Sequence, residues 1–462
     1  YQADKHAEPF WQPNETGGHL NEDYFGGDLE GIRIKLPYLR EMGVDYLYLN
    51  PIFEAHSNHR YNTADYLNVD PLLGTNEEFE VLCREAAKYG IGIVLDGVFS
   101  HTGSDSRYFN REGRYGDGGA YRDPNSPYRS WYDFDPKYKG GYRSWWGFET
   151  LPEVNEETPS YVEFITGPGG VIDTWLRRGA AGFRLDVADE LPDEFIEKVR
   201  AAVKRVSPEK FLLGEVWEDA TTKFGFNKRR TYLLGKGLDS VMNYPFKNAV
   251  LDFVKGKPAE QAMTEILTIC EHYPAPAMDT ALNFLSTHDT ERALTVIADE
   301  PANGRGREWQ SGRNVSGEAY EEGMLRLRMA YAIIYTLPGV PCLYYGDEIA
   351  MQGYRDPFNR AFFRWDAHEQ RLRPVLAQLA QLRHTCEAFR TGQLRVLRAE
   401  DGILHYQRVG KVETAEIIVN RTEHIIVETL ASGKSTEVNP MGFTIVVEEV
   451  GHNPDHSYYD YV

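Results

Sequence analysis

Cysteine is scarce in this chain of 462 residues, and the spacing of its four cysteines gives no sign of a disulfide framework or a metal cluster. No two of them form a Cys-x-x-Cys pair, which excludes a zinc ribbon and a thioredoxin-like redox motif. They lie far apart, in segments that we predict to be helices or strands. We therefore expect free thiols and a cytoplasmic, reducing location for Cys83, Cys270, Cys342 and Cys386.

Long apolar runs and an excess of positive charge are absent as well. No segment approaches the roughly 20 apolar residues of a membrane helix, so we expect no membrane association. No signal peptide is visible, but the chain opens on Tyr1 instead of methionine, so removal of a preceding segment stays open. With 50 Lys and Arg against 70 Asp and Glu, the net charge of −20 disfavours nucleic acid and anionic membranes as partners. A neutral ligand is easier to reconcile with this charge.

A glycine-rich phosphate loop of the GxGxxG or GxxxxGK type is also missing, which disfavours a nucleotide-binding open sheet. What recurs instead is a short apolar run that ends in polar or acidic residues and is followed by an amphipathic helix. Such alternation predicts a parallel sheet that is covered on both faces. The predicted strands lie in 44–53, 91–101, 181–190, 211–220, 238–246, 281–291 and 342–348, and predicted helices lie at 29–43, 76–90 and 193–205.

This pattern predicts an α/β fold, specifically a (β/α)8 TIM barrel. Only seven strands are recognisable, so we expect the first barrel strand to lie upstream of residue 1 or to be cut short at Tyr1. A stretch rich in Gly, Pro, Tyr and Trp is too long for a plain loop and predicts a small inserted domain after the third strand. The predicted domains are the catalytic barrel at 1–101 and 159–390, the inserted domain at 102–158, a C-terminal antiparallel β-domain at 391–450 and a peripheral tail at 451–462.

The segment GFRLDVADE places Arg184 and Asp186 at the end of a predicted strand. Residues two apart on a strand face the same way, and the guanidinium would keep the carboxylate charged, as a nucleophile requires. A structural ion pair is the alternative for an isolated pair. The ends of other predicted strands carry more polar residues, which favours an active site because α/β barrels build theirs at this rim. These residues are Asp96, His101, Glu215, His288 and Asp289.

Four segments, DGVFSH (96–101), GFRLDVADE (182–190), GEVW (214–217) and FLSTHD (284–289), resemble the four short regions of the α-amylase family of glycoside hydrolases, family 13. The order and spacing agree, and the likeness extends over roughly residues 24 to 390. The resemblance implies retention through a covalent glycosyl-enzyme, with two carboxyl groups about 5–5.5 Å apart. It assigns Asp186 as the nucleophile, Glu215 as the acid/base and Asp289 as the third carboxylate. The apolar neighbours of Glu215 would favour its protonated form.

The resemblance also implies substrate-binding residues around this centre. Arg184, His101 and His288 would hold Asp186 and bind sugar hydroxyls, and Asp96 would brace them. Tyr61 would stack on the sugar at the cleavage position, or else be a core tyrosine. Trp217 would be a platform for the leaving sugar, or else pack on the inserted domain. Two residues of the segment DPFNR would grip the next sugar on the non-reducing side, Asp356 and Arg360.

Details of the sequence are most similar to the neopullulanase, cyclomaltodextrinase and maltodextrin-hydrolase group. Glu190 after the nucleophile resembles that group, whereas Glu218 stands where the group usually has histidine. Many α-amylases bind calcium through an asparagine just before the first-region histidine, and Ser100 occupies that place. A calcium site thus stays open but has no support from the sequence, and neither a required cofactor nor a metal site is expected. The oligomeric state stays open, with a dimer as one alternative.

The resemblance therefore implies a retaining glycoside hydrolase that cleaves α-1,4 and some α-1,6 bonds in maltodextrins, cyclodextrins or pullulan. The expected partner is an α-glucan or malto-oligosaccharide substrate. A glucan transglycosylase and an α-1,6-specific oligoglucosidase or pullulanase are the alternatives within the family. An inactive sugar-binding relative is a remote third, because such proteins normally lack a catalytic carboxylate and this chain has all three.

Overall fold

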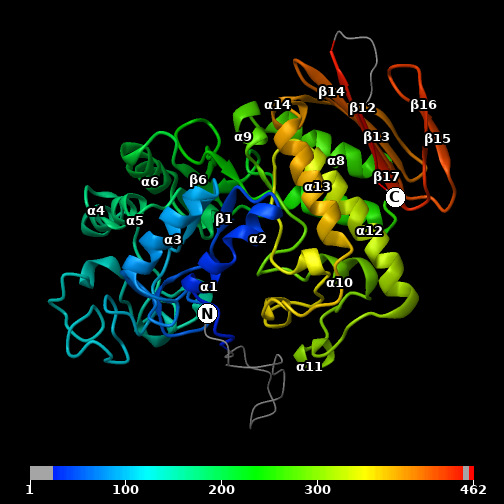
Figure 1. Ribbon diagram of the computed structural model, residues 1–462. Helices are drawn as coiled ribbons and strands as arrows, with labels where there is room; N and C mark the ends of the chain where they lie inside the picture. Colours follow the sequence, from blue (N-terminus) through cyan, green and yellow to red (C-terminus); the bar gives the residue numbers. More distant parts are fainter. Residues whose placement is uncertain (1–23, 451–456, 462) are drawn as a thin grey trace. The chain divides into compact units, whose positions relative to one another are not determined.

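The computed structural model describes residues 24–450 and 457–461, and the chain forms two compact units (Figure 1). Within the described residues, the first unit ends at Met242 and the second begins at Asn243. The predicted first barrel strand, before or at Tyr1, lies outside the described residues. The boundaries predicted for the barrel, the inserted domain and the C-terminal domain stay predictions.

Five parallel strands form the main sheet of the first unit, in the order β1-β4-β5-β6-β9. Each lies within a segment that the sequence predicts to be a strand. The register pairs Asp96 with Arg184 and Leu185 with Gly214, so the carboxyl ends of β4, β5 and β6 lie side by side. The strands are β1 (Tyr46–Tyr48), β4 (Gly92–Gly97), β5 (Gly182–Leu185), β6 (Phe211–Gly214) and β9 (Ser240–Val241).

Helices of the first unit pack on this sheet, with α3 against β4 and α6 against β6. A capping box begins α3, since Thr75 accepts from the amide of Glu78 and Glu78 accepts from the amide of Thr75. The helix predicted over 29–43 is divided at Lys35, because Pro37 lacks the N–H that would continue the first helix. The helices are α1 (Leu29–Ile34), α2 (Leu36–Glu41), α3 (Asn76–Lys88), α4 (Pro159–Thr166), α5 (Val171–Arg177) and α6 (Asp193–Val206).

The segment 102–158 contains short 3-10 turns and β-bridges, and aromatic packing fills its interior. The ring of Phe109 lies 4.6 Å from that of Tyr142 and 4.8 Å from that of Tyr132, measured between centroids. A β-bridge between His101 and Glu153 ties the end of the segment to the residues after β4. The remaining short elements of this unit are β2 (Phe53–Ala55), β3 (Thr63–Val69), β7 (Phe224–Gly225), β8 (Lys228–Arg229), and the turns η1 (Arg129–Trp131), η2 (Lys139–Gly141), η3 (Trp145–Gly147) and η4 (Ala188–Glu190).

The second unit contains a parallel pair, β10 (Leu282–Asn283) and β11 (Val340–Pro341). The strand predicted over 342–348 is therefore wrong: the ladder ends where Cys342 donates to Asn283, and Gly346 with φ 89° then turns the chain. The helices are α7 (Tyr244–Lys255), α8 (Ala259–His272), α9 (Ala275–Asp279), α10 (Ala293–Ala298), α11 (Arg307–Gln310), α12 (Gly317–Thr336), α13 (Leu372–Thr385) and α14 (Ala388–Thr391), with the turns η5 (Asp347–Ile349) and η6 (Phe358–Arg360).

An antiparallel sheet in the order β12-β13-β14-β17-β18 closes the second unit (Figure 1). Its last strand shows that the predicted peripheral tail contributes an edge strand to the sheet, because residues 457–461 pair with β17. The fully buried Arg408 connects the sheet to α12 by donating to the carbonyl of Thr336 at 2.8 Å. The strands are β12 (Gln393–Glu400), β13 (Ile403–Val409), β14 (Glu413–Asn420), β17 (Gly442–Glu449) and β18 (Ser457–Tyr461), with a hairpin of β15 (Ile426–Thr429) and β16 (Ser435–Val438).

Two further observations concern the predicted state of the cysteines and the predicted absence of membrane helices. All four cysteines have free thiols. Within residues 24–450 and 457–461, no helix has the length and apolar character that crossing a membrane requires.

Candidate active site

A fully buried guanidinium, that of Arg184, is the centre of a charged cluster at the ends of β4, β5 and β6. Its Nη1 donates to both oxygens of Asp96, at 2.9 and 3.0 Å, and to Oδ1 of Asp186 at 2.8 Å. Its Nη2 forms an ion pair with Oε2 of Glu215 at 2.7 Å. Burial opposes the charge, but Asp96 and Glu215 hold the pKa of Arg184 well above its usual value. Asp186 and Glu215 thus contact the same guanidinium through different nitrogens.

The carboxyl group of Glu215 has more polar contacts than its sequence neighbours suggest. Its Oε2 accepts from the backbone N–H of Val187 at 2.9 Å, and its Oε1 accepts from the indole of Trp217 at 2.9 Å. Val187 has φ 41° and ψ 49°, a left-handed conformation that costs a β-branched residue free energy. This strained turn directs the amide at Glu215. Glu215 is buried, as are its apolar neighbours Leu213 and Val216, and donors also face both of its oxygens.

Two tyrosine hydroxyls complete the contacts of Asp96. Tyr48 and Tyr61 both donate to its Oδ2, at 2.7 and 2.8 Å. Burial raises the pKa of both tyrosines well above the usual value, so both stay protonated donors. The sequence prediction included Tyr61 but missed Tyr48. Tyr48 lies on β1 beside β4, so the order of the strands was the signal that could have found it.

His101 is buried and holds the backbone around Tyr61. Its Nε2 lies 3.0 Å from the carbonyl oxygen of Tyr61, and its Nδ1 lies 2.9 Å from Oγ of Ser100. Burial lowers the pKa of His101 to about 4, so the imidazole is neutral near pH 7. Both ring nitrogens are thus engaged within the protein, and the contacts support a role in positioning Tyr61.

The second unit brings together the other predicted residues. His288 Nε2 lies 3.1 Å from Asp289 Oδ2, and Arg360 pairs with Asp289 at 3.5 Å and with Asp356 at 3.2 Å. Asn359, which the prediction missed, is fully buried and donates to three carbonyls of this turn, those of Thr287, His288 and Thr290. An asparagine between two predicted site residues in DPFNR was a signal for such a role.

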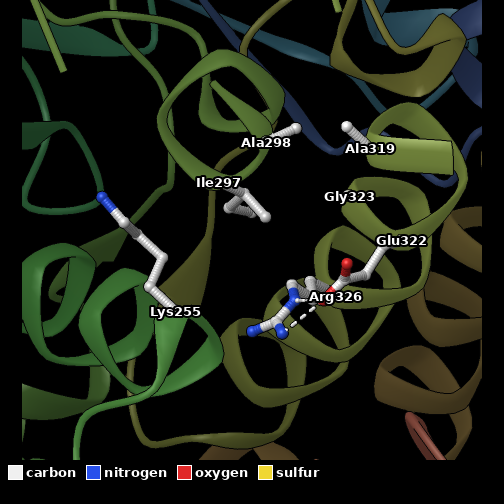
Figure 2. A pocket seen from close by; sticks show the side chains of 7 residues that line it. All are labelled: Lys255, Ile297, Ala298, Ala319, Glu322, Gly323 and Arg326. Atoms are coloured by element: carbon white, nitrogen blue, oxygen red, sulfur yellow. Dashed lines mark hydrogen bonds and ion pairs between the residues drawn. The ribbon is translucent and has the colours of Figure 1, made fainter. Parts of the chain in front are cut away.

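A hollow of about 220 Å³ lies in the second unit between residues of α7, α10 and α12 (Figure 2). Glu322 pairs with Arg326 there at 2.5 Å, and Arg326 also donates to the carbonyl of Val254. The hollow contains none of the predicted site residues, and its arginine is already neutralised. Across the part of the chain that the structure describes, no cluster of three or more His, Cys, Asp or Glu side chains could hold a metal ion.

Comparison with known proteins gives concordant matches. The family model described as alpha amylase, catalytic domain, matches residues 6–392. The chain is 36% identical over 429 residues to an amylopullulanase of Thermoanaerobacter thermohydrosulfuricus. This alignment covers 85% of this chain and 28% of that protein. It is 32% identical over 411 residues to a cyclomaltodextrinase of Geobacillus thermopakistaniensis. That alignment covers 86% of this chain and 63% of the cyclomaltodextrinase. The chain thus spans only about a quarter to two thirds of these relatives.

The solved structures agree with the sequence matches. The ligand-free cyclic α-maltosyl-(1→6)-maltose hydrolase from Arthrobacter globiformis superposes with a TM-score of 0.81 at 27% identity, covering 97% of this chain and 96% of that one. Together with the family match, this similarity confirms the predicted α/β barrel with a C-terminal antiparallel β-domain. The roles assigned to individual side chains stay predictions.

Proposed function

The chain belongs to the α-amylase family, and from this membership we propose that it is a retaining hydrolase of α-glucosidic bonds in maltodextrins, cyclodextrins or pullulan. The observation that carries the proposal is the contact of one buried guanidinium with both Asp186 and Glu215. Retaining hydrolysis needs two carboxyl groups close together, one charged and one protonated. In this proposal Asp186 is the nucleophile, Glu215 the acid/base and Asp289 the third carboxylate.

The contacts of Glu215 suggest which oxygen carries its proton. Oε2 accepts from the amide of Val187 at 2.9 Å and forms an ion pair with Nη2 of Arg184 at 2.7 Å. Oε1 accepts from the indole of Trp217 at 2.9 Å, and a protonated oxygen can still accept one such bond. Oε1 would therefore give its proton to the glycosidic oxygen as that bond breaks.

The two steps follow from this arrangement. An oxygen of Asp186 attacks the anomeric carbon while Glu215 protonates the leaving sugar, which forms a covalent glycosyl-enzyme. Glu215, now a carboxylate, then takes a proton from water, whose oxygen displaces Asp186 with a second inversion. Arg184 at 2.8 Å keeps Asp186 charged and fixed for both steps. Six further residues would bind the substrate around this bond, namely Tyr61, His101, Trp217, His288, Asp356 and Arg360.

A second candidate is preferential cleavage of α-1,6 bonds. The relatives named amylopullulanase and the structurally similar debranching enzyme from Nostoc punctiforme favour it. Transglycosylation is a third outcome, because a sugar in place of water would complete the same intermediate. We propose no metal requirement, because Ser100 is a poor calcium ligand and its hydroxyl is engaged by His101. The free thiols support a reducing, cytoplasmic location.

The test is release of reducing sugar from starch, cyclodextrin and pullulan. We expect Asp186→Asn and Glu215→Gln to lower kcat by about a thousandfold or more. The control is Asp45→Asn, a half-exposed carboxylate that pairs with Arg40 at 3.4 Å. NMR of the first product should show the α-anomer, and a β-anomer would contradict retention.

The products identify the reaction. Panose from pullulan would indicate α-1,4 cleavage, and maltotriose would indicate α-1,6 cleavage. Products longer than a concentrated maltotriose substrate would indicate transfer. An Asp186→Asn protein as active as the wild type would overturn the mechanism. A wild type that binds these glucans but releases no sugar would support the inactive sugar-binding alternative.

A further inference from the structure

Three aromatic side chains of the segment 102–158 (cyan in Figure 1) form a group, and two of them, Trp145 and Trp146, are bonded to the turn that follows the proposed nucleophile. The indole N–H of Trp145 donates to Oε2 of Glu190 at 2.6 Å, and the indole N–H of Trp146 donates to Oε1 at 2.8 Å. Glu190 ends η4, four residues after Asp186. One carboxylate therefore fixes two adjacent indoles.

The outer two rings of this group are exposed to solvent. Trp146 has a relative exposure of 77%, and Phe148 has 57%. Large aromatic rings are usually buried at least in part, so two neighbouring exposed rings are typical of a binding surface. Because the only polar atom of the Trp146 ring is already bonded to Glu190, what remains for a ligand is its apolar face.

The backbone holds Trp146 in a strained position. Its φ of 50° and ψ of 23° are left-handed, a conformation that costs a bulky L-residue about 1–2 kcal/mol. Such strain persists where the surroundings enforce it, and it is frequent at ligand-binding sites. The hydrogen bond to Glu190 is an enforcing contact, and it presents the ring to solvent instead of burying it.

The aromatic group also reaches the charged cluster. The ring of Trp145 lies 5.4 Å from that of His101, and His101 contacts Tyr61, whose hydroxyl donates to Asp96. On its other side, Trp145 stacks with Phe148 at 6.2 Å and 26°. The exposed rings are thus connected to the cluster through Trp145, His101 and Tyr61.

We propose that Trp146 and Phe148 form an outer subsite that binds a glucose unit of the α-glucan beyond the unit whose bond is cleaved. Glu190 is a positioning residue that orients Trp146 through Oε1. An indole face with no free donor suits the C–H face of a pyranose ring, and the net charge of −20 suits a neutral ligand better than an anionic one. The inference rests on the proposed function, because it takes α-glucan as the substrate.

The experiment compares kcat and KM for maltotriose and maltoheptaose. We expect Trp146→Ala to raise KM for maltoheptaose about tenfold, with kcat and the constants for maltotriose unchanged, since one aromatic contact contributes about this factor. Trp146→Phe should recover part of the loss because it retains a ring. Glu190→Gln should give an intermediate loss, because an amide keeps one acceptor of the two. The control is Tyr46→Ala, an aromatic with 62% exposure at the amino end of β1, and it should show no change that depends on substrate length.

Binding to a protein that lacks the nucleophile separates this proposal from the proposed function. Maltoheptaose is titrated by calorimetry into Asp186→Asn and into Asp186→Asn with Trp146→Ala, and the second should bind about tenfold more weakly. If the wild type hydrolyses no glucan but this difference appears, the subsite stands and the proposed reaction fails. If hydrolysis occurs but Trp146→Ala changes neither KM nor binding, the subsite is overturned alone. A change of sedimentation from dimer to monomer in Trp146→Ala, with unchanged KM, would overturn it in favour of contact between two copies.

Discussion

Replacing Arg184 with methionine would remove the cation that contacts Asp96, Asp186 and Glu215 while retaining much of the side-chain volume. The four side chains are between 0% and 10% exposed, so little water is available to compensate the loss. Breaking a buried ion pair by removing one partner costs about 3–5 kcal/mol, because a charge is left buried and unpaired. With three carboxylates left together, we expect a loss of at least about 4 kcal/mol in the free energy of unfolding at pH 7.

The sign of the pH dependence makes this prediction specific. Without the guanidinium, mutual repulsion favours protonation of at least one of the three carboxyl groups in the folded protein. The folded variant then binds more protons than its unfolded chain, so its stability rises as the pH falls. The difference between Arg184→Met and the wild type should therefore shrink from pH 7 to pH 5.

Urea unfolding at both pH values, followed by tryptophan fluorescence, measures this difference. Arg178→Met is the control, because Arg178 pairs with Glu80 at 2.6 Å in a partly exposed position, where such pairs contribute at most about 1 kcal/mol. A loss for Arg184→Met no larger than that of the control would refute the description of this cluster. So would a loss that grows as the pH falls.

Three further predictions concern single contacts. Since burial lowers the pKa of His101 to about 4 from 6.5, the wild type loses stability as the pH falls from 6.5 towards 4, by up to about 2 kcal/mol at pH 5. His101→Gln should reduce the pH dependence of urea unfolding by that amount, and an unchanged dependence would contradict the assignment. Thr75→Ala should cost about 1 kcal/mol in urea unfolding through loss of the α3 cap, and no loss would mean that water replaces it. Dialysis against EDTA should leave activity unchanged because Ser100 is a poor calcium ligand, and activity restored only by added calcium would show otherwise.

The charged cluster was predictable from the sequence to the extent that its members lie on strands with regular geometry. Arg184 and Asp186 are two apart on one strand, so their common direction follows from the pleat, and the structure places them 2.8 Å apart. Tyr48 donates to Asp96 across 48 positions of the chain. Such a contact depends on which strands are neighbours, and the local sequence does not contain that information.

Errors in the prediction of secondary structure have local causes. The run CLYYGDE is apolar enough for a strand, but Gly346 turns the chain before the run is complete. The contacts of Glu190 were not predictable for another reason. A glutamate at this position is similar to one group of the family, but that likeness does not identify its partners. The two indole partners lie 44 and 45 positions away, in a segment of short 3-10 turns and β-bridges.

The buried bond from Arg408 to Thr336 limits how this protein can be recombined. A sheet transplanted from a relative without an arginine at this position would leave the carbonyls of Thr336 and Gly392 without a donor that they have here. A buried carbonyl without its partner costs about 1–3 kcal/mol, a large part of the stability of an ordinary domain. Chimeras should therefore exchange α12 and the sheet as a single piece, since a crossover between them is expected to yield little folded protein.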